Sequence, residues 1–111
     1  MSNYLVLWKE SPSYVEPESP VEQYKQLERL VTALQIQVKE GHIKEIREFV
    51  QGGSGYALTG DISGDQLHMV LERVGNAIPS YLTFEVYQAT TGSVLADLEE
   101  TLEKARKSTT P

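Results

Sequence analysis

Apolar residues recur along the chain with two different periods, and the change from one to the other marks the predicted elements. Alternating or short continuous apolar runs, which are typical of strands, cover residues 4–8, 43–50, 56–60 and 81–88. Three- and four-residue steps, which are typical of amphipathic helices, cover residues 20–40, 64–74 and 93–107. The predicted order is strand, helix, strand, strand, helix, strand, helix.

Start and stop signals bound the first two helices. Ser19 can cap the first helix, Pro20 suits its first turn, and Gly41 is placed to end it in a left-handed conformation. Ser63 and Gln66 have the spacing of a capping box at the start of the second helix. The apolar residues of the first helix form a stripe that we expect to face a sheet: Val21, Tyr24, Leu27, Leu30, Val31, Leu34 and Val38.

The glycine-rich segment 51–55 joins the second and third predicted strands into a hairpin. It lacks the Lys-Ser/Thr pair of a phosphate-binding loop, and no helix follows it directly. We therefore interpret its glycines as a requirement of tight backbone geometry. Residues 10–19, which hold two prolines, are expected to form a long solvated loop.

Two βαβ units in this order predict an α+β fold of the ferredoxin-like βαββαβ type. The expected sheet has four antiparallel strands with both main helices on one face, because parallel crossovers are right-handed. Residues 1–107 are predicted to form one domain, and residues 108–111 a disordered tail. The extra C-terminal helix has an apolar stripe that we expect to point inward: Val94, Leu95, Leu98, Leu102 and Ala105.

Strand alternation assigns side chains to the two faces of the sheet. The set expected beneath the helices is Leu5, Leu7, Ile46, Val50, Tyr56, Leu58, Leu82, Phe84 and Val86. The set expected on the open face is Tyr4, Val6, Trp8, Glu45, Arg47, Phe49, Ala57, Thr59, Thr83, Glu85 and Tyr87. So many aromatic residues are unfavourable in water, so we expect a homodimer in which two open faces meet. The alternative is a monomer whose third helix covers this face.

A pocket between the two sheets would be lined by aromatic side chains with a few polar groups, as small-molecule sites commonly are. Glu85 is the candidate catalytic acid or base, because an apolar surrounding would raise the pKa of its carboxyl group. The other candidate lining residues are Tyr4, Trp8, Glu45, Arg47, Phe49, Thr59 and Tyr87. The structural alternative is a cross-strand ion pair of Arg47 with Glu85 or with Glu45.

Composition excludes several classes of function. The formal net charge of −6 argues against a nucleic-acid partner and against an anionic membrane surface. Cysteine is absent, and His42 and His68 do not form an H-x-x-x-H pair, so we expect no metal site. The N-terminal apolar run has no basic residues before it and is too short for a signal sequence, so we expect a cytoplasmic location.

Several segments resemble the muconolactone isomerase-like proteins of the dimeric α+β-barrel superfamily. They are Glu40–Lys44, Phe49–Leu58, Gly64–Leu67 and Pro79–Val86, within a likeness that covers roughly residues 21–90. The resemblance implies a face-to-face dimer, larger assemblies of it, and a pocket that needs no cofactor. The N-terminal strand, the proline-rich loop and the charged last helix depart from the isomerase, so its activity and catalytic residues are not carried over.

Two functions follow as alternatives. The first is a protein that binds or isomerises a small organic molecule between the sheets. The second is a non-catalytic homo-oligomeric module that binds a ligand or a partner. A third interpretation, a regulatory domain that senses small molecules, would need a separate DNA-binding partner. A polar cavity between the sheets favours the first function, and a tightly filled interface favours the second.

Overall fold

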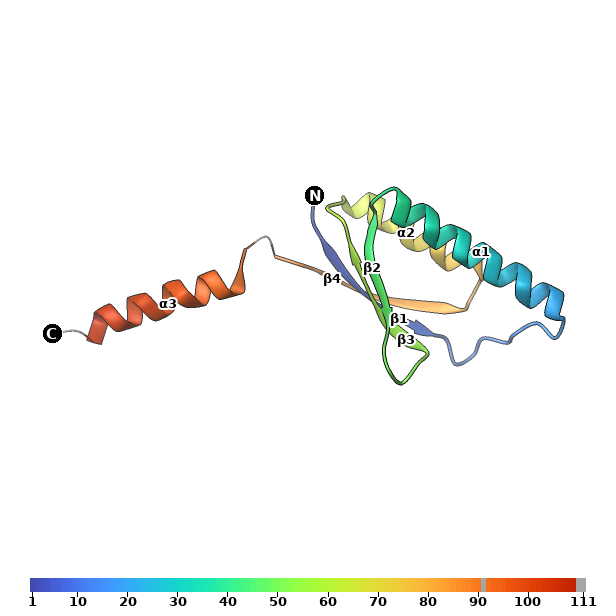
Figure 1. The fold of residues 1–111 in the computed structure, drawn as a ribbon, viewed down its shortest axis with the longest axis horizontal. Helices are drawn as coiled ribbons and strands as arrows, with labels where there is room; N and C mark the ends of the chain where they lie inside the picture. The colour runs from blue at the N-terminus through green and yellow to red at the C-terminus, as the bar shows by residue number, and fades with distance from the viewer. Residues whose placement is uncertain (91, 110–111) are drawn as a thin grey trace.

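The computed structural model describes residues 1–90 and 92–109, and its element order confirms the predicted βαββαβ arrangement with an added C-terminal helix (Figure 1). The elements are β1 (Tyr4–Glu10), α1 (Pro20–Lys39), β2 (Ile43–Glu48), β3 (Ser54–Thr59), α2 (Gly64–Ala77), β4 (Leu82–Gln88) and α3 (Val94–Thr109). The strands lie in the order β2-β3-β1-β4, and all neighbours are antiparallel. Helices α1 and α2 cover one face of this sheet. The fold is therefore α+β and ferredoxin-like.

The turn between β2 and β3 lies two residues earlier in the chain than predicted. Strand β2 ends at Glu48 instead of residue 50, and β3 begins at Ser54 instead of residue 56. Gly52 and Gly53 both have positive φ angles, 79° and 74°, which are readily available only to glycine. The prediction that these glycines serve backbone geometry is thus confirmed, while Val50, which was expected beneath the helices, lies in the loop and is exposed.

The faces of β1 and β3 are the reverse of the prediction. Val6 and Ala57 form the core beneath the helices together with Ile62 and Leu67. Leu5 and Leu7 on β1, and Tyr56 and Leu58 on β3, therefore lie on the open face. The residues that move to the helix side are Tyr4, Val6, Trp8, Ala57 and Thr59. The assignment failed on β1 because both of its alternating sets are apolar.

Strands β2 and β4 present the predicted faces. A register shift between Ile43 and Glu45 keeps Ile43 and Ile46 on the helix side. On β4, Leu82 and Phe84 pack against Val70 and Val74 of α2. Glu45, Arg47, Thr83, Glu85 and Tyr87 consequently lie on the open face, as expected.

Helix α1 uses only part of its apolar stripe against the sheet. Leu30 and Leu34 pack on the core, whereas the other apolar residues of the predicted stripe are exposed: Val21, Tyr24, Leu27, Val31 and Val38. The predicted stripe was wrong because α1 turns a different side toward the sheet near its C-terminal end. There Gln37 is the most deeply buried side chain of α1, with an exposed fraction of 1%.

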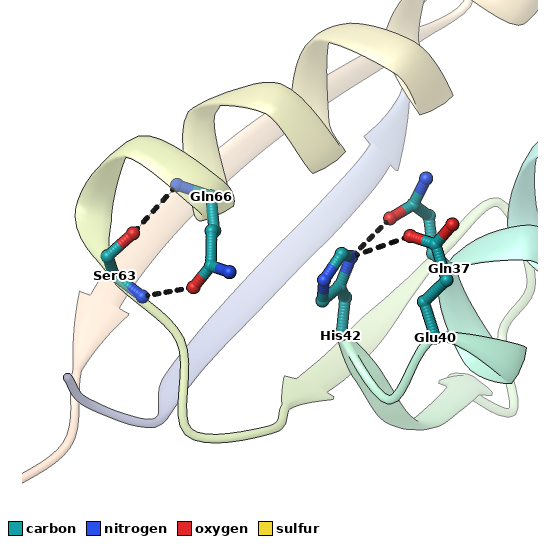
Figure 2. A network of polar contacts seen from close by, with 5 residues as sticks. All are labelled: Gln37, Glu40, His42, Ser63 and Gln66. Atoms are coloured by element: carbon teal, nitrogen blue, oxygen red, sulfur yellow. Dashed lines mark hydrogen bonds and ion pairs between the residues drawn. The ribbon is translucent and has the colours of Figure 1, made fainter.

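The buried amide of Gln37 has a histidine partner. Figure 2 shows the ring of His42 beside Gln37 and Glu40, with its Nδ1 atom 2.8 Å from Oε1 of Gln37 and 3.5 Å from a carboxylate oxygen of Glu40. The backbone N–H of His42 also donates to the Gln37 carbonyl at 2.9 Å. Because buried polar groups need partners, this pair fixes the entry of the chain from α1 into β2. His42 thus has a structural role.

The capping box that the sequence predicts for α2 is present. The Gln66 backbone N–H donates to the Ser63 side chain at 3.1 Å, and the Ser63 N–H donates to the Gln66 side chain at 2.9 Å (Figure 2). The helix continues through Gly75, past its predicted end at residue 74, and ends at Ala77. A Cβ atom on Gly75 would lie 3.4 Å from the Phe84 ring, so glycine at this position allows α2 to lie close to β4.

Helix α3 extends away from the body of the protein and contacts no other element of the described chain (Figure 1). The molecule is consequently 76 Å long and only 29 by 18 Å across. The stripe that was expected to point inward is exposed, with 70% of Leu102 accessible to solvent. The helix also continues to Thr109, into the predicted tail, while residues 110 and 111 lie outside the described chain.

Candidate functional site

A cavity of about 180 Å³ lies between the sheet and the two covering helices. Its walls are mostly hydrocarbon and come from every element except α3, including Val6, Leu34, Ile43, Val70 and Phe84. Helix α1 leaves this space open because only Leu30 and Leu34 are its main contacts with the core. The cavity is therefore an apolar site within a single subunit.

Trp8 forms part of the cavity wall, and its position depends on Gly55. The two residues are directly opposite on β1 and β3, and a Cβ atom on Gly55 would lie 2.5 Å from the indole ring. The indole therefore lies against the glycine backbone. Its Nε1 atom is fully buried and has no hydrogen-bond partner among the described residues. Leaving this donor unpaired is unfavourable, which indicates that packing sets the position of the ring.

Three polar side chains lie at one end of the cavity: Glu10 from the end of β1, Glu48 from the end of β2, and Tyr81 just before β4. The Tyr81 hydroxyl donates to Oε1 of Glu10 at 2.5 Å. Partial burial, followed by this hydrogen bond and the negative charges of Glu10 and Glu48, raises the pKa of Tyr81 to about 12. Tyr81 is thus held as a neutral hydrogen-bond donor across the working range of pH.

A second, wider hollow of about 650 Å³ begins at the same polar end. It lies between the loop after β1 and the first half of α1, and it shares Glu10, Leu30 and Tyr81 with the inner cavity. The Tyr14 ring from this loop packs on the Tyr81 ring with a centroid separation of 4.9 Å. The Tyr81–Glu10 pair therefore stands between an outer, solvated hollow and the inner, apolar cavity.

We expect Tyr81 to be among the last of the six tyrosines to ionise in a spectroscopic pH titration. Because its pKa is raised from 10.0 to about 12, it stabilises the fold fully below pH 10, and this contribution is lost as the pH rises towards 12. Glu10→Gln should lower the pKa of Tyr81 part of the way, since burial remains its largest cause. An unchanged tyrosinate titration in Glu10→Gln would contradict the assigned contact. Glu72→Gln, which removes a carboxylate from the exposed side of α2, serves as the control.

On the open face, two rows of side chains run across all four strands. The first consists of Arg47, Tyr56, Leu7 and Glu85, and the second of Glu45, Leu58, Leu5 and Tyr87. The centre of these two rows is apolar, and their ionised groups lie on the two edge strands, while Lys9 of the central strand β1 lies on the same face between Ser54 and Thr83. A hollow of about 210 Å³ lies at one end of this face, and its lining includes Leu7, Lys9, Phe49 and Glu85.

Short polar contacts along each edge strand hold the candidate residues of the open face. Arg47 pairs with Glu45 at 3.2 Å, and the Tyr87 hydroxyl donates to Glu85 at 2.9 Å. The latter bond is the main reason that the pKa of Tyr87 is raised. Arg47 and Glu85 belong to strands β2 and β4, which are three strand spacings or roughly 14 Å apart. The predicted Arg47–Glu45 pair is thus present, but it forms within β2 and not across strands, and the prediction of an Arg47–Glu85 pair within the chain is wrong.

Of the remaining predicted lining residues, only Phe49 shares this surface. Tyr4, Trp8 and Thr59 lie on the helix side, as the reversal of β1 and β3 requires. Thr59 is only 2% exposed, and its hydroxyl accepts a hydrogen bond from the Tyr4 backbone N–H at 2.8 Å. Phe49 follows β2 and packs against Tyr56 with ring centroids 6.1 Å apart. The residues predicted for one site are therefore divided between the two faces.

The residues at the polar end of the cavity were missed by sequence reasoning. Glu10 was assigned to the loop after Trp8, although it continues the alternation of β1 and has the same parity as Trp8. Glu48 was placed within β2 without a role. The sequence feature that could have identified Glu10 is this alternation, which places it on the same side of the sheet as Val6 and Trp8.

No group of three or more potential metal-ligating side chains comes together within residues 1–90 and 92–109. His68 lies on the exposed side of α2, 3.6 Å from Glu72 one turn later. None of the helices in the described chain is long and apolar enough to cross a bilayer.

The chain matches no known protein-family model, and no curated protein matches its sequence. Among solved structures, it is similar to 30S ribosomal protein S6 from Thermotoga maritima, with 20% sequence identity and a TM-score of 0.36. The alignment covers 95% of this chain and 97% of the ribosomal protein. The resemblance to muconolactone isomerase-like proteins stays a prediction.

Proposed function

We propose that the protein binds a small organic molecule in the cavity between the sheet and helices α1 and α2. The observation that supports this best is the combination of an apolar interior of about 180 Å³ with three polar groups gathered at one end. The hydroxyl of Thr59, which also lines the cavity, is already hydrogen-bonded to backbone groups. Small-molecule sites are commonly apolar with a few polar groups that orient the ligand. An apolar cavity of about 150 Å³ in another protein takes up benzene, so the present one has room for a single ring.

This proposal replaces a site between two sheets with a site inside each subunit. The open face supports it less well as a ligand site, because its hollow beside Lys9, Phe49 and Glu85 has less apolar wall than the inner cavity. Binding without catalysis is proposed because the walls of the cavity are hydrocarbon and its polar groups lie at the end. The ligand is held without a cofactor in this proposal.

Trp8 provides a direct test, since it is the only tryptophan and it lines the cavity. Titration with toluene should change its fluorescence in a saturable manner. Leu34→Phe, which fills the cavity from α1, should weaken this binding at least about tenfold by steric exclusion. Leu58→Phe adds the same ring volume on the open face and should leave binding unchanged. Emission that stays constant up to the solubility of toluene would remove the proposal.

We further propose that the protein is a homodimer that forms through the open face. The supporting observation is the row of Arg47, Tyr56, Leu7 and Glu85, which has opposite charges at its two ends. A two-fold axis parallel to the strands places this row on its own copy in reverse order. Arg47 then meets Glu85 of the second copy, and Leu7 meets Tyr56, so charge and apolar area are both complementary.

Reversing one of these charges should weaken the dimer. Arg47→Glu places like charges opposite each other, and we expect its dimer dissociation constant to rise at least about tenfold in sedimentation experiments. Combining Arg47→Glu with Glu85→Arg should restore much of the affinity. Arg73→Glu, on helix α2 and away from this face, is the matched control. A wild-type chain that sediments as a monomer at high protein concentration would refute the dimer.

A further inference from the structure

We propose that the ligand of the cavity is an organic cation: a single aromatic ring joined through a short chain to an ammonium group. The inference rests on the proposed binding function and specifies its ligand. It starts from the polar end of the cavity, where Glu10, Glu48 and Tyr81 come together from three strand ends. The ring occupies the apolar interior, and the ammonium group lies at this end.

The two carboxylates at this end have no basic partner. None of the ion pairs within residues 1–90 and 92–109 includes Glu10 or Glu48. The neighbouring Lys9 alternates to the opposite face of the sheet, where it pairs with Ser54 and Thr83 in the strand register. Both carboxylates are exposed to solvent beside the apolar space, and together they favour a positively charged ligand and disfavour an anionic one.

The third polar group strengthens this selection. Tyr81 uses its hydroxyl proton to donate to Oε1 of Glu10, so the other carboxylate oxygens remain as acceptors. An ammonium group supplies three donors and accepts none, which matches a set of acceptors. The tilted rings of Tyr14 and Tyr81, whose centroids are 4.9 Å apart, also present aromatic surface that attracts a cation.

The size and lining of the cavity define the other half of the ligand. An interior of about 180 Å³ accommodates one ring but not a fused system with several substituents. Its walls combine aliphatic residues such as Val70 with the aromatic ring of Phe84, against which an aromatic ligand can pack. A polar head and an apolar ring at opposite ends reproduce the polarity of the cavity itself.

The test compares three probes of nearly equal shape: 2-phenylethylammonium, 2-phenylethanol and phenylacetate, each titrated against Trp8 fluorescence at neutral pH. We expect the ammonium compound to bind at least about tenfold more tightly than the alcohol, and the carboxylate to bind most weakly. Equal affinity of the ammonium compound and the alcohol would overturn the inference while the cavity proposal stands. If none of the three binds, and toluene does not bind either, both proposals fail.

Variants at the polar end test whether Glu10 and Glu48 cause the preference for the ammonium probe. The double variant Glu10→Gln and Glu48→Gln should lose at least about tenfold in affinity for the ammonium probe and retain its affinity for the alcohol. Glu45→Gln changes a carboxylate on the opposite face of the same β2 strand and should alter neither. An unchanged ammonium affinity in the double variant would overturn the inference. Thermal unfolding of each variant verifies that the fold is retained, because a general loss of structure would abolish binding of the alcohol as well.

Discussion

Gly55→Ala should destabilise the domain by about 4 kcal/mol, a large fraction of the stability of a small protein. An added Cβ atom would lie 2.0 Å from the backbone carbonyl oxygen of Arg47 and 2.5 Å from the Trp8 ring. The first neighbour belongs to the paired strand β2 and cannot move without disturbing the ladder. The second lies in the core, so the substitution displaces backbone and side chain together.

Urea unfolding followed by Trp8 fluorescence measures this effect. Gly64→Ala is the matched control, because its Cβ atom would meet only the Tyr4 hydroxyl, at 3.9 Å, and alanine suits the first turn of α2. We expect the control to be neutral or slightly stabilising. If Gly55→Ala unfolds at the same urea concentration as the wild type, the close approach of β1, β2 and β3 at this point is wrong.

Val6→Asp should leave the chain predominantly unfolded, whereas Leu7→Asp should leave it folded. Val6 is 3% exposed beneath the helices, and an unpaired carboxylate there costs roughly 3–5 kcal/mol. Leu7 is the next residue of β1 and lies on the open face, where an added carboxylate remains in contact with water. The same substitution at adjacent positions therefore has opposite consequences.

Circular dichroism and sedimentation separate these outcomes. We expect Leu7→Asp to retain the native spectrum and to be monomeric, because it places two charges at the centre of the proposed dimer. Val6→Asp should lose the native signal of Trp8. A folded Val6→Asp protein together with an unfolded Leu7→Asp protein would restore the face assignment that the alternation first predicted.

The order of elements could be predicted because local signals determine it. The capping box of Ser63 and Gln66 and the left-handed Gly41 at the end of α1 both depend on residues close in sequence. The split βαβ order then leaves few topologies, and right-handed crossovers select the one observed. For this reason the fold class was within reach of a single sequence.

The faces of the central strands could not be predicted in the same way. Strand β1 is apolar at five consecutive positions, Tyr4 to Trp8, so alternation carries no information there. On β3, the residues beneath the helices are the small Gly55, Ala57 and Thr59, while the larger Tyr56 and Leu58 face outward. The close approach of the Trp8 ring favours a small side chain at residue 55, which outweighs the ordinary preference for burying large ones.

The candidate site was beyond sequence reasoning for a different reason. Glu10 and Tyr81 are 71 residues apart, and only the pairing of β1 with β4 brings them together. The cavity behind them depends on how high α1 lies above the sheet, which varies continuously and leaves no periodic pattern. The apolar stripe of α1 was consistent with full burial, yet only Leu30 and Leu34 reach the core.

The isolation of α3 has a thermodynamic consequence. A helix of 16 residues without tertiary contacts is close to the length limit at which helices persist alone in water, and it melts gradually. The sheet and its two helices share a core and should melt together. Backbone ellipticity and Trp8 emission therefore follow different transitions on heating, and only the tryptophan signal reports the cooperative unit. Anything that covers Leu95, Leu98 and Leu102 would bring the two curves together.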